Sequence, residues 1–239
     1  MTRRKQVLLS WSSGKDSAWS LSALRRDPAI EVVGLLTTLN RAADRVAMHA
    51  VRSELLERQA ERVGLPLTKL DLPYPCSNAD YEAIMGKAMD EARAAGVEAI
   101  AFGDLFLADI RAYREEKLAG TGLEPLFPLW GSDTTELAQQ MVAGGLRAKL
   151  TSIDPKQLDA RFAGRDYDAD LLAELPEAVD PCGERGEFHS FVYDSPEFSA
   201  PIDIELGEIV ERDGFVFADV LPKGVTWSAE SAKTRTTIE

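Results

Sequence analysis

The chain has 239 residues, of which 45% are hydrophobic and 28% are charged, a composition typical of a soluble globular protein with one large or two small domains. Its formal net charge of −13 argues against a nucleic-acid partner, because a broad nucleic-acid interface needs clustered Lys and Arg. No apolar run is long enough to span a membrane, and no signal-peptide core follows Met1, so we expect a cytoplasmic protein. The two cysteines, Cys76 and Cys182, form no Cys-x-x-Cys pair, which excludes a zinc or redox motif of that kind and favours small buried hydrophobes.

In the first half of the chain, short apolar runs alternate with segments of helical periodicity. The predicted strands are Gln6–Ser10, Glu31–Thr38, Leu67–Leu70 and Ala99–Phe102, and the predicted helices are Asp16–Arg26, His49–Val63, Asn78–Ala95 and Asp109–Ala119. Strands that alternate with helices in this way form a parallel sheet with helices on both faces. The first half therefore predicts an α/β fold of Rossmann-like type.

The second half has a less regular pattern. The segment Leu123–Trp130 contains two prolines and is predicted to mark a transition between domains. After it come predicted helices at Thr134–Ala143 and Asp168–Leu175, and predicted strands at Arg147–Ile153, Phe188–Tyr193, Ile202–Arg212 and Phe215–Leu221. We expect an N-terminal domain over residues 1–125, a smaller C-terminal α+β domain over 126–222, and a flexible tail over 223–239.

A loop of small residues follows the first predicted strand. Its sequence, Ser12-Ser13-Gly14-Lys15-Asp16-Ser17, leads directly into the first predicted helix. The first N–H groups of a helix have no intrahelical partner and favour an anion, so this loop is suited to bind a phosphate. Lys15 adds a mobile positive charge, and Asp16 is able to hold a cation that accompanies phosphates. The alternative interpretation of the whole loop is an ordinary Ser/Gly turn at the start of a helix.

Other polar residues follow neighbouring predicted strands. Thr37–Asn40 follow the second strand, and Gly103-Asp104 follow the fourth. Ligands of parallel α/β sheets bind at the carboxyl ends of the strands, so these segments and the Ser12–Ser17 loop are expected to meet in one crevice.

A second dense cluster of polar residues lies near the start of the strand predicted at Phe188. The run Asp180–Ser190 contains Glu184, Glu187 and His189, and the last two are expected on one strand face. A carboxylate beside a histidine is suited to acid–base chemistry or to holding an amine. The alternative is a solvated, charge-rich turn.

The loop differs from the common P-loop, because no glycine stands five residues before Gly14 and Asp16 follows Lys15. It resembles the SGGxDS loop of the ATP pyrophosphatases, also called PP-loop enzymes, with Ser13 where that family usually has its first glycine. Members of that family split ATP between the α- and β-phosphates and adenylate a substrate oxygen.

The run GERGEFHSFV, which begins at Gly183, resembles the GExGEFHTxV signature of the diphthine–ammonia ligase family within the adenine nucleotide alpha hydrolases. Further matches are Gly103-Asp104-Leu105, the DxRxYRE pattern with Arg111 and Arg114, Phe127-Pro128-Leu129-Trp130, Met48-His49 and Gln59-Ala60-Glu61. The resemblance covers about residues 6 to 203 and implies a HUP-type N-terminal domain. Ser190 replaces the commoner threonine and keeps the hydroxyl.

The resemblance implies roles for individual residues. The implied nucleotide-binding residues are Ser12, Ser13, Gly14, Lys15, Asp16, Ser17, Leu36, Thr37, Thr38, Gly103 and Asp104. Magnesium is implied at Asp16 and Asp104. The implied substrate residues are Arg111, Arg114, Glu184, Glu187, His189 and Ser190, and the implied catalytic residues are Lys15, Asp16, Glu184, Glu187 and His189. Structural alternatives remain for Leu36 as strand core, for Asp104 as a helix cap, and for the two arginines as solvated surface residues.

The implied reaction is an ATP-dependent amide ligation with ATP and Mg²⁺ as cofactors. A substrate carboxylate is adenylated, pyrophosphate leaves, and ammonia displaces AMP. The implied acceptor is diphthine, a modified histidine on translation elongation factor two. The alternatives are a member of the family with another acceptor and a non-catalytic nucleotide sensor. A homo-oligomer is compatible with the sequence.

Overall fold

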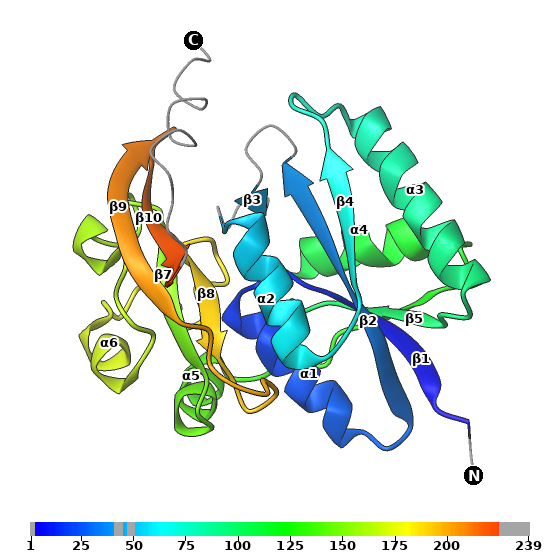
Figure 1. Cartoon of the computed structure of the whole chain (residues 1–239), viewed down its shortest axis with the longest axis horizontal. Helices are drawn as coiled ribbons and strands as arrows, with labels where there is room; N and C mark the ends of the chain where they lie inside the picture. Colours follow the sequence, from blue (N-terminus) through cyan, green and yellow to red (C-terminus); the bar gives the residue numbers. More distant parts are fainter. Residues whose placement is uncertain (1–2, 41–44, 47–50, 225–239) are drawn as a thin grey trace.

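The computed structural model describes residues 3–40, 45–46 and 51–224 (Figure 1). His49 and the segment 225–239, which includes most of the predicted tail, lie outside the described residues. The strands of the first half are β1 Lys5–Ser10, β2 Ile30–Asn40, β3 Arg45–Val46, β4 Leu67–Leu72, β5 Ala99–Ala101 and β6 Glu124–Leu126. The helices between them are α1 Lys15–Arg26, α2 Ser53–Val63, α3 Asn78–Ala94 and α4 Ala108–Leu118.

These strands form one sheet in which β1 lies between β2 and β5, with β4 beside β2 and β6 beside β5. All of these pairs are parallel, whereas the short β3 pairs with the end of β2 in the antiparallel direction. The expected α/β fold of Rossmann-like type is therefore confirmed. The segment after Leu123, predicted only as a transition, begins with the edge strand β6, which is too short for a pattern and contains Pro125.

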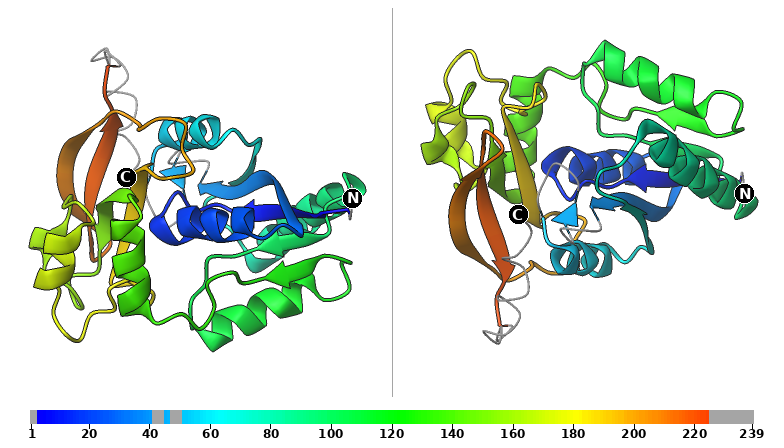
Figure 2. Two further views of the ribbon diagram at one scale, coloured as in Figure 1. Left: turned by 90° about the horizontal axis from the view of Figure 1, so that it is seen from below. Right: turned by 90° about the horizontal axis from the view of Figure 1, so that it is seen from above.

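Helices cover both faces of this sheet (Figure 2). Because successive strand residues point to opposite faces, Val7 and Leu9 of β1 share a core with α1 and α2, whereas Leu8 packs into a separate core with α3 and α4. Local signals fix the ends of these helices. α2 ends at Gly64, which is left-handed with φ = 73°, and α3 is capped by Ser77, whose hydroxyl accepts the Asp80 N–H at 3.1 Å. The structure thus confirms the helix start predicted at Asn78, with Ser77 as its cap.

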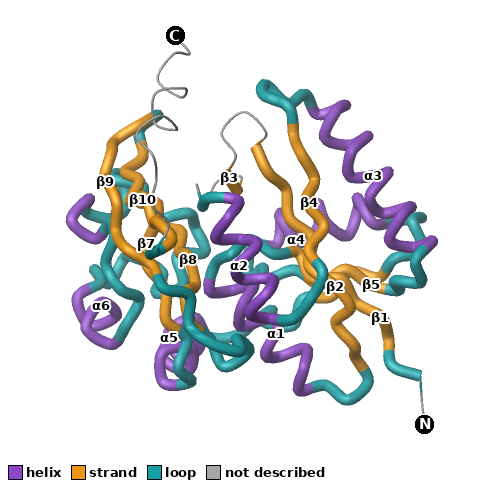
Figure 3. Tube along the Cα trace, viewed as in Figure 1, coloured by secondary structure: helices purple, strands orange, loops and turns teal. Residues whose placement is uncertain are grey.

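The second half forms a four-stranded sheet in the order β8-β7-β10-β9 (Figure 3). Its strands are β7 Arg147–Ile153, β8 Phe188–Asp194, β9 Ile204–Arg212 and β10 Phe215–Pro222, and its helices are α5 Thr134–Ala143, the short 3₁₀ helix η1 Ala160–Phe162 and α6 Ala169–Glu174. All strand pairs in it are antiparallel. The expected smaller α+β part is confirmed.

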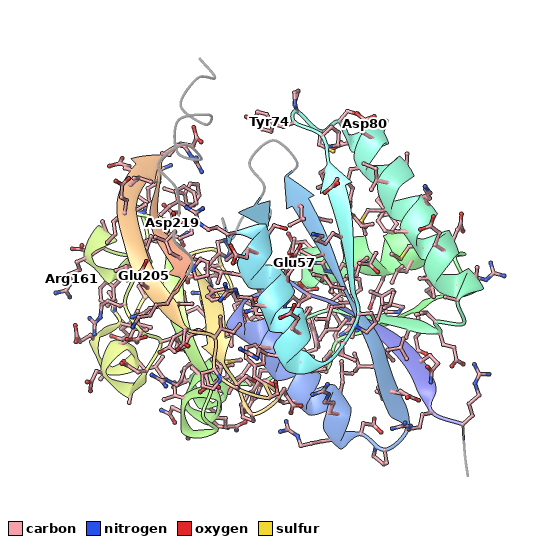
Figure 4. All side chains as sticks on the ribbon, viewed as in Figure 1. Glu57, Tyr74, Asp80, Arg161, Glu205 and Asp219 are labelled. Atoms are coloured by element: carbon pink, nitrogen blue, oxygen red, sulfur yellow. The ribbon has the colours of Figure 1, made fainter. Side chains whose placement is uncertain are left out.

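The two halves share one apolar core on the side of α1 and α2. Trp19 and Leu21 of α1 belong to the same cluster as Phe188 and Phe191 of β8. A polar contact adds to this interface, because Arg52 donates two hydrogen bonds to Asp219 of β10, on the side of that strand toward α2 (Figure 4). As a result, β8 lies against the start of α1, where the predicted phosphate loop is.

Candidate active site

The segment between β1 and α1 is a closed loop held by its own hydrogen bonds. Gly14 N–H donates to Ser12 Oγ at 3.3 Å, Ser17 Oγ donates to the Gly14 carbonyl at 2.9 Å, and the two serine hydroxyls lie 3.2 Å apart. Ser13 is fully buried with φ = 68°, in the left-handed region that favours glycine. The position at which the resemblance expects a glycine thus keeps a glycine-like backbone although a serine occupies it.

Lys15 points into the protein. Its Nζ lies 2.8 Å from a carboxylate oxygen of Asp16, donates to the carbonyl of Cys182, and lies 5.4 Å from the centre of the Phe188 ring. Burial opposes the charged form, but Asp16 and other neighbouring groups outweigh it, so the pKa of Lys15 is raised. Lys15 is therefore charged and joins the phosphate loop to the Asp180–Ser190 segment, in contrast to the mobile charge that we expected.

The end of β5 approaches the start of α1 closely. A Cβ at Gly103 would lie 3.1 Å from the Asp16 carbonyl carbon and 3.2 Å from the Ser17 nitrogen, so only glycine fits without a shift of the backbone. The next residue, Asp104, forms a two-point ion pair with Arg114, at 2.6 Å from Nε and 3.3 Å from Nη2. The structure thus brings these two strand-end residues beside the loop and gives Asp104 a cationic partner.

Glu187 closes the turn that precedes β8. Its side chain is 1% exposed, and its two carboxylate oxygens accept the backbone N–H groups of Asp180 and Arg185, each at 2.9 Å. Gly183, at φ = 67°, lies in the same turn and would place a Cβ 2.8 Å from the Phe188 carbonyl. Both oxygens of Glu187 are therefore engaged in holding the backbone, so this carboxylate has a structural task in addition to any contact with substrate.

Glu184 lies between the turn and the end of β5. Its Oε1 accepts the Leu105 N–H at 2.8 Å, which links the two halves of the chain. Burial is the main cause that raises the pKa of Glu184 to about 7, with a further contribution from the negative charge of Asp16, while the hydrogen bond from Leu105 and the charge of Lys15 oppose the shift. A carboxyl group with a pKa near neutrality is able to exchange a proton under physiological conditions.

His189 and Ser190 point to opposite sides of β8. His189 lines a cavity, and burial together with the nearby charge of Lys15 lowers its pKa to about 4, so its imidazole is neutral at pH 7. Ser190 is buried, and its Oγ accepts the backbone N–H of Lys15 at 3.2 Å. A residue predicted to contact the acceptor thus caps the first turn of α1 from across the interface, which is possible only because β8 packs there.

The cavity, of about 530 Å³, opens at the carboxyl ends of β1, β2 and β5. Its strand-end lining includes the predicted residues Ser12, Leu36, Thr37, Thr38 and His189. One wall is apolar and comes from Met85, Met89, Ile100, Phe102 and Leu118. A polar part comes from α3, α4 and the residues after α4, namely Tyr81, Glu82, Tyr113, Arg114, Lys117 and Thr121. Of the three segments expected to meet in one crevice, Ser12, Thr37 and Thr38 line this cavity, whereas Ser13–Ser17, Gly103 and Asp104 are outside its lining, so the expected crevice is present only in part.

The two predicted arginines have different surroundings. Arg114 lines the cavity, and its guanidinium lies 4.4 Å from the centre of the Phe102 ring. Arg111 is outside the cavity lining, stacks at 4.8 Å on Phe127 and 4.7 Å on Trp130, and pairs with Glu115 of its own helix. Only Arg114 is therefore placed to meet a ligand in the cavity.

Within the described residues, no group of three or more His, Cys, Asp or Glu side chains is arranged to hold a metal ion. This does not suit a metal held by protein ligands alone. Magnesium, however, commonly takes one or two carboxylates together with substrate phosphates, and Asp16 at the phosphate loop fits that mode. Both carboxylates already have a cationic partner, Lys15 for Asp16 and Arg114 for Asp104, so a metal at either position would share the carboxylate with that cation.

Sequence reasoning missed the cavity walls and one buried residue behind the loop. The walls from α3 and α4 carried no motif, since their contribution depends on how the helices pack across the sheet. Gln59 of α2, noted only as part of a matching segment, is fully buried and bonds to Trp11, Ser13 and Val192. A glutamine at an apolar helix position was the available signal.

In the described part of the chain, no helix is long and apolar enough to cross a membrane.

Comparison with known proteins identifies relatives of this chain. Residues 5–124 match the family model of the diphthamide synthase N-terminal domain, and residues 133–219 match that of the diphthamide synthase C-terminal domain. A relative from Danio rerio named diphthine–ammonia ligase is 28% identical over 87% of this chain and 90% of its own length. Proteins of that name from Bos taurus and Homo sapiens are 31% and 30% identical, and each match covers 52% of this chain and 48% of the relative. The chain therefore belongs to the diphthamide synthase family.

Proposed function

We propose that this chain is an ATP-dependent ligase that joins ammonia to a carboxylate of an acceptor, as the name diphthine–ammonia ligase of its relatives indicates. The observation that carries the proposal is the position of the phosphate loop beside two groups of the second half of the chain: Ser12 of the loop lines the same cavity as His189, and the carboxyl of Glu184 lies within reach of the charges of Lys15 and Asp16. A protein that only sensed nucleotide would have no use for a carboxyl group with a pKa near 7 beside the loop. The acceptor is proposed to be diphthine or a related carboxylate.

In this proposal the nucleotide occupies the cavity. The apolar wall around Met89, Ile100 and Phe102 suits an adenine ring. The phosphates then lie toward the start of α1, where backbone N–H groups and the positive end of the helix dipole favour an anion. Arg114, which pairs with Asp104, lines the same cavity and is proposed to turn toward the phosphates when they bind. Magnesium would be held by Asp16 together with phosphate oxygens and would neutralise charge on the leaving pyrophosphate.

The reaction has two steps. In the first, a carboxylate oxygen of the acceptor attacks the α-phosphorus of ATP, and the bond to the β-phosphate oxygen breaks, which gives an acyl-adenylate and pyrophosphate. In the second, the nitrogen of ammonia attacks the acyl carbon, and the bond to the AMP oxygen breaks. The amine nitrogen loses one proton in this step, and Glu184 in its ionised form is proposed to accept it. The chain contributes mainly by positioning and by charge neutralisation.

Neutral His189 suits the same site. It lines the cavity with a pKa of about 4, so it is uncharged at pH 7 and adds no positive charge to the cavity. Glu187 is proposed to act through the turn that it closes, because its oxygens already accept two N–H groups. These roles refine the assignment from the sequence, which treated both carboxylates alike.

An isotope experiment tests the proposal. The protein is incubated with ATP, magnesium, ammonium and candidate acceptors whose carboxylate carries ¹⁸O. Adenylation of the carboxylate transfers one labelled oxygen to AMP, so we expect AMP and pyrophosphate as products with ¹⁸O in the AMP. Formation of ADP, or of AMP without label in the presence of a product amide, would overturn the proposed function. An Asp16→Ala variant serves as the inactive control.

A further inference from the structure

Gln59 of α2 joins segments that are far apart in the sequence. Its side chain is fully buried, and its Oε1 accepts the Trp11 Nε1–H at 2.8 Å. Its Nε2 donates to two backbone carbonyls, that of Ser13 at 3.0 Å and that of Val192 at 2.6 Å. One amide group thus connects the end of β1, the phosphate loop and β8, and it lies outside the lining of the cavity.

The Ser13 carbonyl needs this support. Ser13 adopts φ = 68°, a region that non-glycine residues keep only where the surroundings impose it. Its carbonyl accepts a second bond from the Val192 N–H at 3.0 Å, so the peptide group between Ser13 and Gly14 is held from two sides. The orientation of this peptide plane sets the direction of the following N–H groups, which are those that a phosphate would meet at the start of α1.

The same contacts set the position of the loop relative to β8. That strand carries His189 on the cavity side and Ser190, whose Oγ accepts the Lys15 N–H. A shift of Ser13 relative to Val192 would therefore move the phosphate loop away from the groups on β8. The apolar wall of the cavity is built by β5, α3 and α4 and makes none of these bonds, although Trp11, which bonds to Gln59, lines another part of the cavity.

We propose that Gln59 is a positioning residue for the phosphates of the nucleotide. It touches no reacting atom, and it acts by holding the Ser13 carbonyl and the register between the phosphate loop and β8. This inference rests on the proposed function, since it takes ATP as the ligand. The competing explanation is that Gln59 is a buried polar group satisfied by nearby partners, with no selective effect on any part of the ligand.

Binding of ATP and of adenosine separates these explanations. Both ligands present the same base and ribose, but only ATP has phosphates, so a phosphate-positioning residue affects one and spares the other. Dissociation constants are measured by isothermal titration calorimetry for the wild type and for Gln59→Met, which keeps the length of the side chain and removes the amide. We expect ATP to bind about tenfold more weakly to the variant, with adenosine affinity changed less than about twofold.

Two further variants complete the design. Leu56→Val, on the same helix and equally buried, lowers stability without altering these hydrogen bonds and is expected to bind both ligands like the wild type. Gln59→Glu keeps the shape of the side chain but places a second oxygen against two carbonyl oxygens. We expect this variant to bind ATP more weakly while binding adenosine normally. Part of the ATP affinity should return at low pH, because the protonated acid again donates a hydrogen bond. Gln59→Glu also replaces Gln59→Met should that variant fail to fold.

The outcomes are distinct. If the Gln59 variants lose affinity equally for ATP and adenosine, or lose affinity for neither, the positioning role is overturned and the proposed function still stands. If the wild type binds ATP no more tightly than adenosine, the proposed function is overturned, and this inference with it. The inference is supported if both Gln59 variants bind ATP more weakly but adenosine as well as the wild type does, and if Leu56→Val binds both ligands like the wild type.

Discussion

Replacement of Ser13 by glycine should stabilise the protein, although Ser13 is a fully buried residue. Ser13 is 0% exposed, its φ is 68°, and its Oγ has no hydrogen-bond partner among the described residues. A left-handed backbone costs a non-glycine residue about 1 kcal/mol, and a buried hydroxyl without a partner costs about another 1 kcal/mol. Glycine has more conformational entropy in the unfolded chain, and this lowers the gain by about 0.7 kcal/mol. The net gain is about 1 kcal/mol.

Thermal unfolding measures this effect. For a chain of this size, a gain of about 1 kcal/mol raises Tm by about 3 °C. The matched control is Ser22→Gly, which removes a buried hydroxyl that also has no partner among the described residues, but from the regular backbone of α1. Glycine costs about 0.5 kcal/mol there relative to serine, which leaves a net gain of about 0.5 kcal/mol from removal of the hydroxyl, so the two variants should differ by about 0.8 kcal/mol in free energy of unfolding. A Ser13→Gly protein no more stable than Ser22→Gly would refute the reasoning.

Four other substitutions test separate parts of the site. Asp16→Ala should abolish pyrophosphate release while leaving adenosine affinity within about twofold, and full retention of turnover would remove Asp16 from the proposed site. In the wild type, the rate of amide formation should rise as pH increases through about 7, because Glu184 accepts a proton only when ionised, and Glu184→Gln should lose this rise in a pH–rate profile. The same raised pKa means that ionisation of Glu184 disfavours the folded state, so the stability of the wild type relative to Glu184→Gln should fall as the pH of the unfolding measurement rises from 5 to 8. Glu187→Gln should lower the free energy of unfolding in urea by about 2 kcal/mol, because an amide group no longer accepts both backbone N–H groups of the turn. Glu177→Gln, at an exposed position, should leave it unchanged, and equal values for the two variants would mean that the turn does not depend on the carboxylate. Gly103→Ala should weaken ATP binding at least about tenfold, since its Cβ would press on the start of α1, and unchanged calorimetric affinity would contradict the close approach.

Much of the fold follows from local patterns. The apolar runs around Val7–Leu9 and Val32–Leu36 predicted strands, and their alternation with helices predicted a parallel sheet with a crevice at the strand ends. Gly14 and the serines around it placed the phosphate loop at the start of α1, and the structure confirms that helix. Local periodicity determines these features because helices and strands are stabilised mainly by neighbours in sequence or by one continuous apolar face.

The partners of the charged and polar groups were decided only by the tertiary structure. Sequence alone treated Glu184 and Glu187 alike, yet one accepts the N–H of Leu105 from the other half of the chain and the other closes its own turn. Gln59 reaches Val192 across 133 positions of sequence. A buried polar group must find a partner wherever packing brings one, and packing depends on side-chain shapes throughout the core rather than on spacing along the chain. The sequence thus determined which elements form and where the loop proposed to bind phosphate stands, and the packing of β8 against α1 decided which side chains surround that loop.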